Sequence, residues 1–416
     1  MRTVLFEDPY VSELDPLALA RPAYLLSCGG STLFAGLQQV TGISSAIVRP
    51  HLKAVELSDR AFSNESVSER DGLTLLVNAR LVPSVGTFRT LAELLRRKTP
   101  CVVSTEHGIA VAVLPETVKV PDDLSTLEGY YLLRDRIAMY DIPEEEFELS
   151  MLTHAHDIVS EHLLNFDDTL EKRIASGNYH QLSDGVFVVD PNTVIDPLVR
   201  CETSKGPILI EENVTIGPFT LLRGPLHIGA NSIVNEHAAL KENVWIGNNC
   251  KVGGEVEEST IEPFSNKQHH GFMGHSYIGS WVNLGAGTSN SDLKNTYGEI
   301  RIDYDSGRCN TGMQFLGCMI GDYTKSAINT SIFTGKVIGA CSMLYGFITT
   351  NVPSFANYAR TFGQVTELPD SVLIDTQRRM FTRRRITQRQ IDIQLIHDMY
   401  ELVRKKRQLV EERLAL

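Results

Sequence analysis

The sequence predicts a protein in which an α/β domain is followed by a parallel β-helix and then by a C-terminal helix. Three observations carry this prediction. Short apolar runs alternate with amphipathic stretches over the first 185 residues. Aliphatic residues then recur at every sixth position over much of the second half, and leucines spaced by seven follow near the end. These are three different sequence patterns, and each is typical of a different architecture.

We place the first domain at residues 1–185 and expect it to be mixed α/β. Short β-branched and aliphatic runs predict strands at 3–6, 73–78, 102–104 and 109–114. Amphipathic stretches predict helices at 91–98 and at 157–174, the second with Asp157 as a possible N-cap. Residues 182–190 look like a bridge into the next domain.

The six-residue period predicts a parallel β-helix over residues 186–355. It is neither the helical period of 3.6 nor the strand period of 2. Three hexapeptides form one triangular coil of about 18 residues, so aliphatic side chains stack inside the prism. Glycines after them would permit corners with positive φ or close approach of neighbouring coils. The repeated positions are Ile210, Ile216, Leu222, Ile228, Val234, Leu240, Ile246 and Val252, then Ile278, Leu284, Ile320, Ser326, Ile332, Ile338 and Leu344.

Two polar segments interrupt the hexapeptide register, at residues 265–275 and at about 288–312. A uniform coil has no pocket, and solenoids carry their sites at register breaks and loops. We therefore expect functional residues in these two segments.

Residues 356–416 form a C-terminal extension, in which a long amphipathic helix is expected from about Thr387. Leu395, Leu402, Leu409 and Leu416 are spaced by seven. Two arrangements fit this seam: a short trimeric coiled coil, or a helix that packs back against the β-helix.

Composition excludes several function classes. The formal charge of −12 disfavours a nucleic-acid-binding protein, although residues 378–416 hold 11 Lys and Arg against 5 Asp and Glu. No apolar run approaches the ~18 residues of a membrane span, and the charged start does not look like a signal peptide. Seven cysteines without a Cys-x-x-Cys pair indicate free thiols in a reducing cytoplasm.

The segment HHGFMGHSYIGSWVNLGAGT (269–288) resembles the acetyltransferase half of the bifunctional sugar-1-phosphate enzyme GlmU. The stretch DLKNTYG (292–298) is closer to a divergent GlmU-like group described as sugar nucleotidyltransferases. The resemblance implies a nucleotidyltransferase-like first domain and a left-handed β-helix with acyltransferase activity. It also implies acetyl-CoA or another acyl-CoA as co-substrate, and a sugar phosphate or sugar nucleotide as the small-molecule partner.

The resemblance assigns residues in the β-helix. The family's catalytic histidine falls on His269, and the residues matched to substrate or acyl-CoA contacts are Asn283, Ala286, Asn290, Asp292, Lys294 and Tyr297. Two positions depart from the family: its tyrosine is Phe272 here, and its substrate-binding lysine is Glu257. An anion cannot hold the phosphate that a cation held, so we do not expect glucosamine-1-phosphate bound in the family's way.

The first domain departs further, because the family's Gly-rich nucleotide loop and its metal-binding aspartate are absent. Two hypotheses remain open. In the first, Arg21, Arg80 and the backbone amides of Gly29 and Gly30 bind the phosphates, and another carboxylate binds Mg²⁺. In the second, the domain is a relic that binds ligand or only supports its neighbour. The candidate nucleotide-binding residues are Arg21, Gly29, Gly30, Asn78 and Arg80.

Acyl transfer needs a base, an oxyanion site and oriented substrates. We predict His269 as the base, since imidazole titrates near neutrality, and amides of residues 285–287 as the oxyanion site. One alternative is a zinc enzyme similar to γ-class carbonic anhydrases, with His237, His270 and His275 as ligands. Another is a non-catalytic sugar-nucleotide scaffold. The family resemblance and the leucine seam favour a homotrimer.

Overall fold

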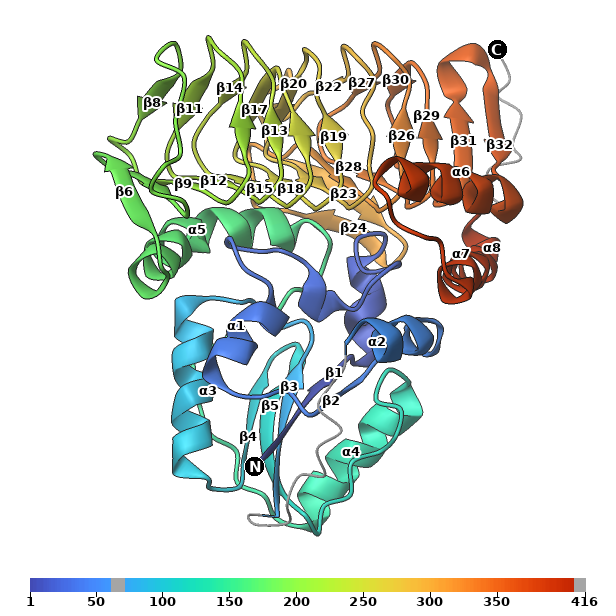
Figure 1. Ribbon diagram of the computed structural model, residues 1–416. Coiled ribbons are helices and arrows are strands. Elements are labelled where there is room, and N and C mark those ends of the chain that lie inside the picture. Colours follow the sequence, from blue (N-terminus) through green and yellow to red (C-terminus); the bar gives the residue numbers. More distant parts are fainter. Residues whose placement is uncertain (61–71, 408–416) are drawn as a thin grey trace.

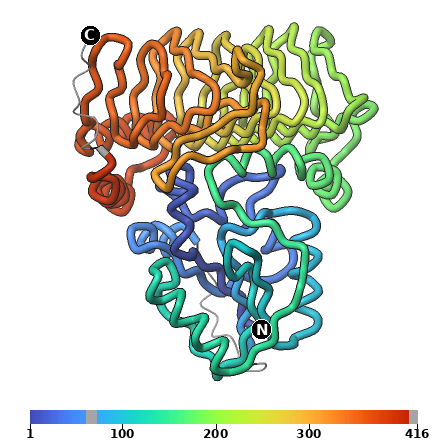
Figure 2. Tube along the Cα trace, turned by 180° about the vertical axis from the view of Figure 1, so that it is seen from behind, coloured from blue at the N-terminus to red at the C-terminus, as the bar shows by residue number. Residues whose placement is uncertain are grey.

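The computed structural model describes residues 1–60 and 72–407, in which an α/β domain lies beneath a long β-helix (Figure 1). The predicted fold class is confirmed. The trace seen from behind shows α5 (Asp157–Ser176) running along the underside of the β-helix, between the two bodies (Figure 2).

The α/β domain is built on one five-stranded sheet in the order β2-β1-β3-β5-β4. The strands β1, β2 and β3 are parallel, and β5 runs antiparallel between β3 and β4. All four predicted strands are present, each within a residue or two of its expected ends. The strands are β1 (Arg2–Phe6), β2 (Ser45–Ile47), β3 (Leu73–Asn78), β4 (Cys101–Thr105) and β5 (Gly108–Pro115). The helices are η1 (Pro9–Leu14), η2 (Ala23–Leu25), α1 (Leu33–Val40), η3 (Pro50–Leu52), α2 (Lys53–Asp59), α3 (Val85–Arg97) and α4 (Leu127–Met139).

The β-helix stacks short parallel strands in columns, as the hexapeptide period predicted. Ile210, Ile228 and Ile246 pair directly from coil to coil, and all three are buried. The hairpin β6–β7 starts the prism, because β7 pairs with β9, and the predicted boundary at residue 185 falls inside this hairpin. The first strands are β6 (His180–Ser183), β7 (Val186–Val188), β8 (Arg200–Glu202), β9 (Ile208–Ile210), β10 (Thr215–Ile216), β11 (Leu221–Arg223), β12 (Leu226–Ile228), β13 (Ile233–Val234), β14 (Ala239–Leu240), β15 (Val244–Ile246) and β16 (Lys251–Val252).

The remaining strands carry the columns to the end of the prism. They are β17 (Glu255–Glu257), β18 (Thr260–Ile261), β19 (Asn266–Lys267), β20 (Phe272–Gly274), β21 (Tyr277–Ile278), β22 (Ser289–Asn290), β23 (Arg301–Tyr304), β24 (Gly307–Asn310), β25 (Cys318–Ile320), β26 (Lys325–Ser326), β27 (Ser331–Ile332), β28 (Lys336–Ile338), β29 (Met343–Leu344), β30 (Phe347–Ile348), β31 (Ala356–Ala359) and β32 (Gln364–Glu367), with η4 (Arg360–Phe362) between the last two.

Glycines in the repeat serve close approach of the coils. A Cβ on Gly217 would lie 2.4 Å from the amide nitrogen of Glu236 in the next coil. Most corners with positive φ are instead held by other residues, among them Asn213, Asn231 and Asn249. Asparagine tolerates this conformation better than most residues. Of the two roles expected for the glycines, close approach is therefore the one that the repeat uses.

The first register break is a shortened coil and not a loop. Ile261 pairs with Ile246, only 15 residues earlier, and β18, β19 and β20 continue the three columns. The second break is a true insertion, because Ile278 pairs with Ile320. It contains the antiparallel hairpin β23–β24, whose tip docks on the α/β domain.

The two bodies share one apolar core and a buried ion cluster. Arg21 of the α/β domain donates to Asp322 (Nη2 to Oδ2, 2.6 Å) and its Nη1 lies 3.3 Å from Glu262 Oε2, both on the β-helix. Glu262 also accepts from the Ser27 amide at 2.9 Å and from the hydroxyl of Tyr277. Burial raises the pKa of the Asp322 carboxyl, while Arg21 opposes that rise. This cluster fixes the loop after β1 to the β-helix.

The C-terminal extension differs from the predicted single long helix. It folds into α6 (Asp370–Arg383), α7 (Gln390–Leu402) and α8 (Arg404–Arg407). The apolar face of α7 is buried within the chain, at Leu395, Ile396 and Met399, and belongs to the same core as the α/β domain. Leu402 is exposed, and Leu409 and Leu416 lie outside the described residues. The coiled-coil expectation is therefore wrong for α7, because its seam is already covered by its own chain.

Among residues 1–60 and 72–407, no helix has the length and apolar character needed to span a bilayer.

Arg21→Met should lower the free energy of unfolding by about 3–5 kcal/mol, because it leaves two buried carboxylates without their cation. Urea unfolding measures this loss. The exposed pair of Arg97 with Glu145 provides the matched control, and Arg97→Met should lower the stability far less, because solvent screens an exposed ion pair. Equal small losses in both variants would contradict the role of Arg21 as the link between the bodies.

Candidate functional site

The residues predicted to bind nucleotide are used inside the α/β domain. Arg80 is 1% exposed and donates to both carboxylate oxygens of Asp8, at 2.8 and 2.7 Å. Asn78 donates to Asp8 at 2.9 Å and accepts from the Arg80 amide. These side chains follow β1 and β3 at the carboxyl edge of the parallel strands, where open α/β sheets usually bind ligands. Here that edge is filled by the chain's own charges.

The other three candidate residues are also committed to contacts within the chain. Arg21 is committed to the ion cluster with the β-helix. Gly29 and Gly30 form a tight turn buried against α5, where added Cβ atoms would lie 2.8 Å from Asn165 and 2.7 Å from Phe166. We therefore assign these five residues structural roles.

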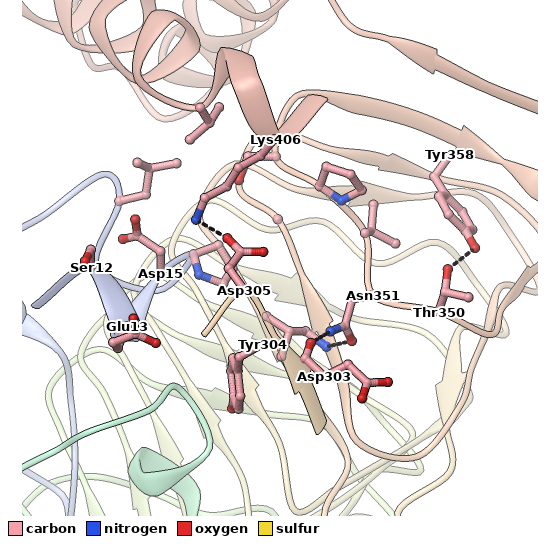
Figure 3. Close-up of a pocket in the computed structure, with 18 of the residues that line it drawn as sticks. Ser12, Glu13, Asp15, Asp303, Tyr304, Asp305, Thr350, Asn351, Tyr358 and Lys406 are labelled. Carbon is pink, nitrogen blue, oxygen red and sulfur yellow. Dashed lines mark hydrogen bonds and ion pairs between the residues drawn. The ribbon is translucent and has the colours of Figure 1, made fainter. Parts of the chain in front are cut away.

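A cavity of about 620 Å³ lies between the loop after β1, the hairpin β23–β24 and the last coils (Figure 3). Its polar wall includes Asp15 and Asp305, and Asp305 forms an ion pair with Lys406 at 2.6 Å. On the opposite wall Thr350 and Tyr358 share a hydrogen bond of 2.8 Å. Charges of both signs line this space, so its lining does not single out one kind of ligand.

His269 lies at the corner after β19, within the first register break. Its imidazole is exposed, and its Nε2 is 3.2 Å from Nε2 of Gln268. Its neighbour His270 is also exposed, and the His270 carbonyl accepts from the Gly287 amide at 3.1 Å. The two histidines thus share one corner, within the first of the two segments where functional residues were expected.

The corner that carries His269 is held from inside the prism by Lys267. This side chain takes an inward position between Val252 and the next coil and is 3% exposed. Its Nζ donates to the carbonyls of Gly253, His269 and Gly271, at 2.8, 3.1 and 2.7 Å. All three ammonium protons therefore have acceptors. Burial nevertheless lowers the pKa of Lys267 to about 8.

Asn283 is exposed on the coil that follows His269, and its Oδ1 accepts from Asn266 Nδ2 at 3.3 Å. The turn after it was the predicted oxyanion site. The Gly285 amide donates to Ser326 Oγ at 3.0 Å, and the Gly287 amide donates to the His270 carbonyl. Two of the three amides are thus committed, which leaves Ala286 as the remaining position of the predicted set.

The other predicted contact residues are dispersed. Asn290 is buried in the prism, where it accepts from the Gly274 amide at 2.9 Å and donates to the Gly274 carbonyl at 3.0 Å. Lys294 donates to the Glu299 carbonyl, and Tyr297 is 68% exposed with positive φ. The buried position of Asn290 makes its role structural.

Asp292 and His275 form a charged cluster on neighbouring coils. His275 Nδ1 lies 2.9 Å from Asp292 Oδ2, its Nε2 contacts Glu258, and its ring stacks on Phe315. Burial opposes protonation of His275, but hydrogen bonds and charges of Asp292 and Glu258 outweigh it and raise the pKa to about 9.

The histidines of the zinc alternative are not brought together within one chain. His237 stacks on Phe219, and His270 is exposed at its corner. Within the described residues, one group has metal-ligand spacing: Glu257, His275 and Asp292. Metal binding needs a neutral imidazole, whereas the carboxylates around His275 favour its protonated form.

A cleft of about 430 Å³ opens beside Asn283, between the β-helix and the last turn of α6. Lys251, Lys325, Arg383 and Arg384 line it, together with Asn266, Gln268 and Asn283. Sequence reasoning missed these four cations. The arginines lie about 100 residues away in the chain, and the lysines occupy outward strand positions that the hexapeptide pattern does not constrain.

Sequence comparison finds similar proteins among the sugar nucleotidyl transferases and the GlmU proteins. Residues 3–172 match the model of the sugar nucleotidyl transferase family. The bifunctional sugar-1-phosphate nucleotidylyltransferase/acetyltransferase of Sulfurisphaera tokodaii is 33% identical over 147 residues, which cover 34% of this chain and 36% of that protein. The bifunctional protein GlmU of Rippkaea orientalis is 28% identical over 186 residues, covering 38% and 37%. The chain spans about a third of the length of these relatives. The GlmU-like resemblance is confirmed.

Solved structures with similar parts include the UDP-N-acetylglucosamine acyltransferase of Francisella novicida, at 17% identity and a TM-score of 0.25, covering 54% of this chain and 82% of that one. Another is a point mutant of the GDP-perosamine N-acetyl transferase of Caulobacter crescentus, solved with CoA and GDP-perosamine, at 11% identity and a TM-score of 0.15, covering 37% of this chain and 51% of that one. Because both TM-scores are this low, no argument rests on these two structures, and the β-helix is established by the strand pairings described above.

Protonation of His275 should stabilise the fold below neutral pH. Because its pKa is raised from about 6.5 to about 9, this contribution is complete below pH 6.5 and is lost as pH rises through 9. The free energy of unfolding of the native protein minus that of His275→Gln should fall by up to about 3 kcal/mol across this window. Urea unfolding at a series of pH values tests it, and a constant difference would contradict it.

Proposed function

We propose that the β-helix catalyses CoA-dependent acyl transfer to an amino sugar or sugar phosphate, with His269 as the general base. The observation that carries the proposal is the placement of an exposed histidine on a corner anchored from inside the prism, next to the coil of Asn283. The names of the relatives, which join nucleotidyl transfer to acetyl transfer, support the same reaction class. The co-substrate is acetyl-CoA or another acyl-CoA.

The chemistry follows from the position of His269. The acceptor amine or hydroxyl attacks the thioester carbonyl, and the imidazole takes the proton that this nucleophile loses. The tetrahedral intermediate then collapses, the C–S bond breaks and the CoA thiol leaves with a proton. Lys267 contributes by fixing the backbone of the corner, so the imidazole keeps one position relative to the acceptor.

We propose that the α/β domain is a scaffold and not a second active site. Its carboxyl edge is filled by the pairs of Arg80 with Asp8 and of Arg49 with Glu7, in which all four side chains are buried. A nucleotide with Mg²⁺ would have to displace these buried ion pairs, which is costly. The small-molecule chemistry would then belong to the β-helix, in a cytoplasmic protein.

His269→Ala should lower the rate of acyl transfer by ~10²–10⁴, the usual contribution of a positioned acid–base group. The fold should be retained, because this side chain is exposed at a corner and is not part of the prism interior. Thiol release from acetyl-CoA, measured against a panel of amino sugars and their 1-phosphates, gives the rate.

His270→Ala is the matched control, since it removes the same side chain one residue away and should change the rate much less. Loss of activity in His270→Ala with retention in His269→Ala would move the base by one residue. If both variants lost a bound zinc together with activity, a carbonic-anhydrase-like reaction would replace acyl transfer.

We propose a homotrimer in which copies meet along the β-helix. The apolar seam on α7 is buried within the chain and does not join the copies. Large apolar side chains do remain exposed on the coils of the β-helix. Exposed apolar patches on a single chain usually mark contacts with another protein. Their exposed fractions are 58% for Phe219, 68% for Ile328, 47% for Phe333 and 54% for Phe347.

Light scattering should give the mass of three 46.2 kDa chains, about 139 kDa. The double variant Phe333→Asp, Phe347→Asp should shift the protein toward a single chain, because buried charges oppose an apolar contact. A native protein that stays a single chain at micromolar concentration would refute the trimer.

A further inference from the structure

The cleft between α6 and the β-helix gathers positive charge without any negative charge. Four of its lining residues are basic. Lys251 and Lys325 lie on one β-helix face, with the strand positions of Asn266 and Asn283 between them, and Arg383 and Arg384 lie at the C-terminal end of α6. The remaining lining residues are amide, aromatic or thioether side chains, and none is acidic.

These four cations lack carboxylate partners in the part of the chain that the structure describes. Arg384 instead donates to the amide oxygen of Asn266 at 2.9 Å, and Lys325 donates to the carbonyls of Trp281 and Tyr323, at 2.6 and 3.0 Å. Neutral acceptors orient these groups but do not cancel their charge. Burial lowers the pKa of Lys325 to about 7, so this side chain is only partly protonated near neutral pH, and a bound anion would favour its charged form. Converging like charges in a partly buried space raises the free energy of the empty cleft.

A structural explanation accounts for only half of this arrangement. Arginines in the last turn of a helix are stabilised by the helix dipole, which would explain Arg383 and Arg384. The same explanation does not apply to Lys251 and Lys325, which lie on β-strands. Phe381 of α6 contacts Trp281, with ring centroids 4.7 Å apart, and this contact brings the arginines over the lysines.

We propose that this cleft is a binding site for phosphate groups, in which arginines from α6 and lysines from the β-helix hold a phosphorylated small molecule. Arginine and lysine are the side chains that bind phosphate most effectively, through charge-assisted hydrogen bonds. The amides of Asn266, Gln268 and Asn283 add neutral donors at the wall. A volume of 430 Å³ lies in the range of small-molecule sites and admits more than one phosphate.

The position of the cleft connects it with acyl transfer, and this part of the inference rests on the proposed function. Gln268 lines the cleft and contacts His269. A molecule anchored by its phosphates would therefore place its other end near the proposed base. Either substrate could supply these phosphates, the acyl-CoA or a phosphorylated sugar.

Isothermal titration of the full-length protein with pyrophosphate, at fixed ionic strength, tests the site directly. The double variant Arg383→Gln, Arg384→Gln should weaken binding by about 10²- to 10⁴-fold, because each of the two charge-assisted hydrogen bonds contributes about one to two factors of ten. Lys251→Gln should weaken it in the same direction. The matched control is Arg379→Gln, which removes an exposed cation from the same helix outside the cleft and should bind as the native protein does.

Competition identifies the source of the phosphate. Displacement of pyrophosphate by coenzyme A assigns the cleft to the acyl donor, and displacement by a sugar 1-phosphate assigns it to the acceptor; either result supports the site. No pyrophosphate binding by the native protein, or equal binding by the double variant and the Arg379→Gln control, would overturn it. Phosphate binding without thiol release from any acceptor would leave the cleft standing and reject the acyltransferase.

Discussion

The constraint on which the structure depends is that each coil of the β-helix must place one side chain into each interior column. Where these side chains are aliphatic, coils stack with little room for variation. Around residues 265–290 the interior becomes polar, with Lys267 and Asn290 in positions that Ile and Val occupy elsewhere. Such groups are tolerable only because every polar atom finds a backbone or hydroxyl partner.

This polar interior lies beneath the candidate site. Lys267 binds the carbonyls of the His269 corner, and Ser326 Oγ lies 2.7 Å from Thr288 and accepts from the Gly285 amide. A buried network that is fully hydrogen-bonded rigidifies its surroundings more than an apolar contact of the same size. The coils that carry His269 and Asn283 thus add buried lysine and asparagine hydrogen bonds to the aliphatic packing and the hydroxyl contacts, such as that of Ser232, that join the earlier coils.

The α/β domain shows how a ligand-binding edge becomes a structural joint. The loop after β1, which follows the strand end where nucleotides would approach, instead carries Arg21 to Glu262 and Asp322. Behind it, Arg80 and Arg49 form ion pairs with Asp8 and Glu7, and all four side chains are buried. A triphosphate at this edge would have to displace these buried pairs, and this cost is the reason for our proposal that the domain is a scaffold.

Local spacing in the sequence predicted some features of this protein, and others became visible only in the tertiary structure. The hexapeptide period determined the columns, and the family motif located His269 and Asn283, because both depend on local spacing. The shortened coil at Ile261 was not visible, since dropping a few residues mimics a loop in a one-dimensional pattern. The coiled-coil prediction for α7 was wrong because leucines spaced by seven show that one face of a helix is apolar but not which surface covers that face.

By itself, then, the sequence determined the fold class, the repeat and the corner that bears the two histidines. Only the tertiary structure decided the partners of the charged groups. Arg21 meets carboxylates more than 240 residues away, and Arg383 and Arg384 reach Lys251 and Lys325 from another element. Charge interactions act through space, and their strength depends on distance and burial that no local pattern contains.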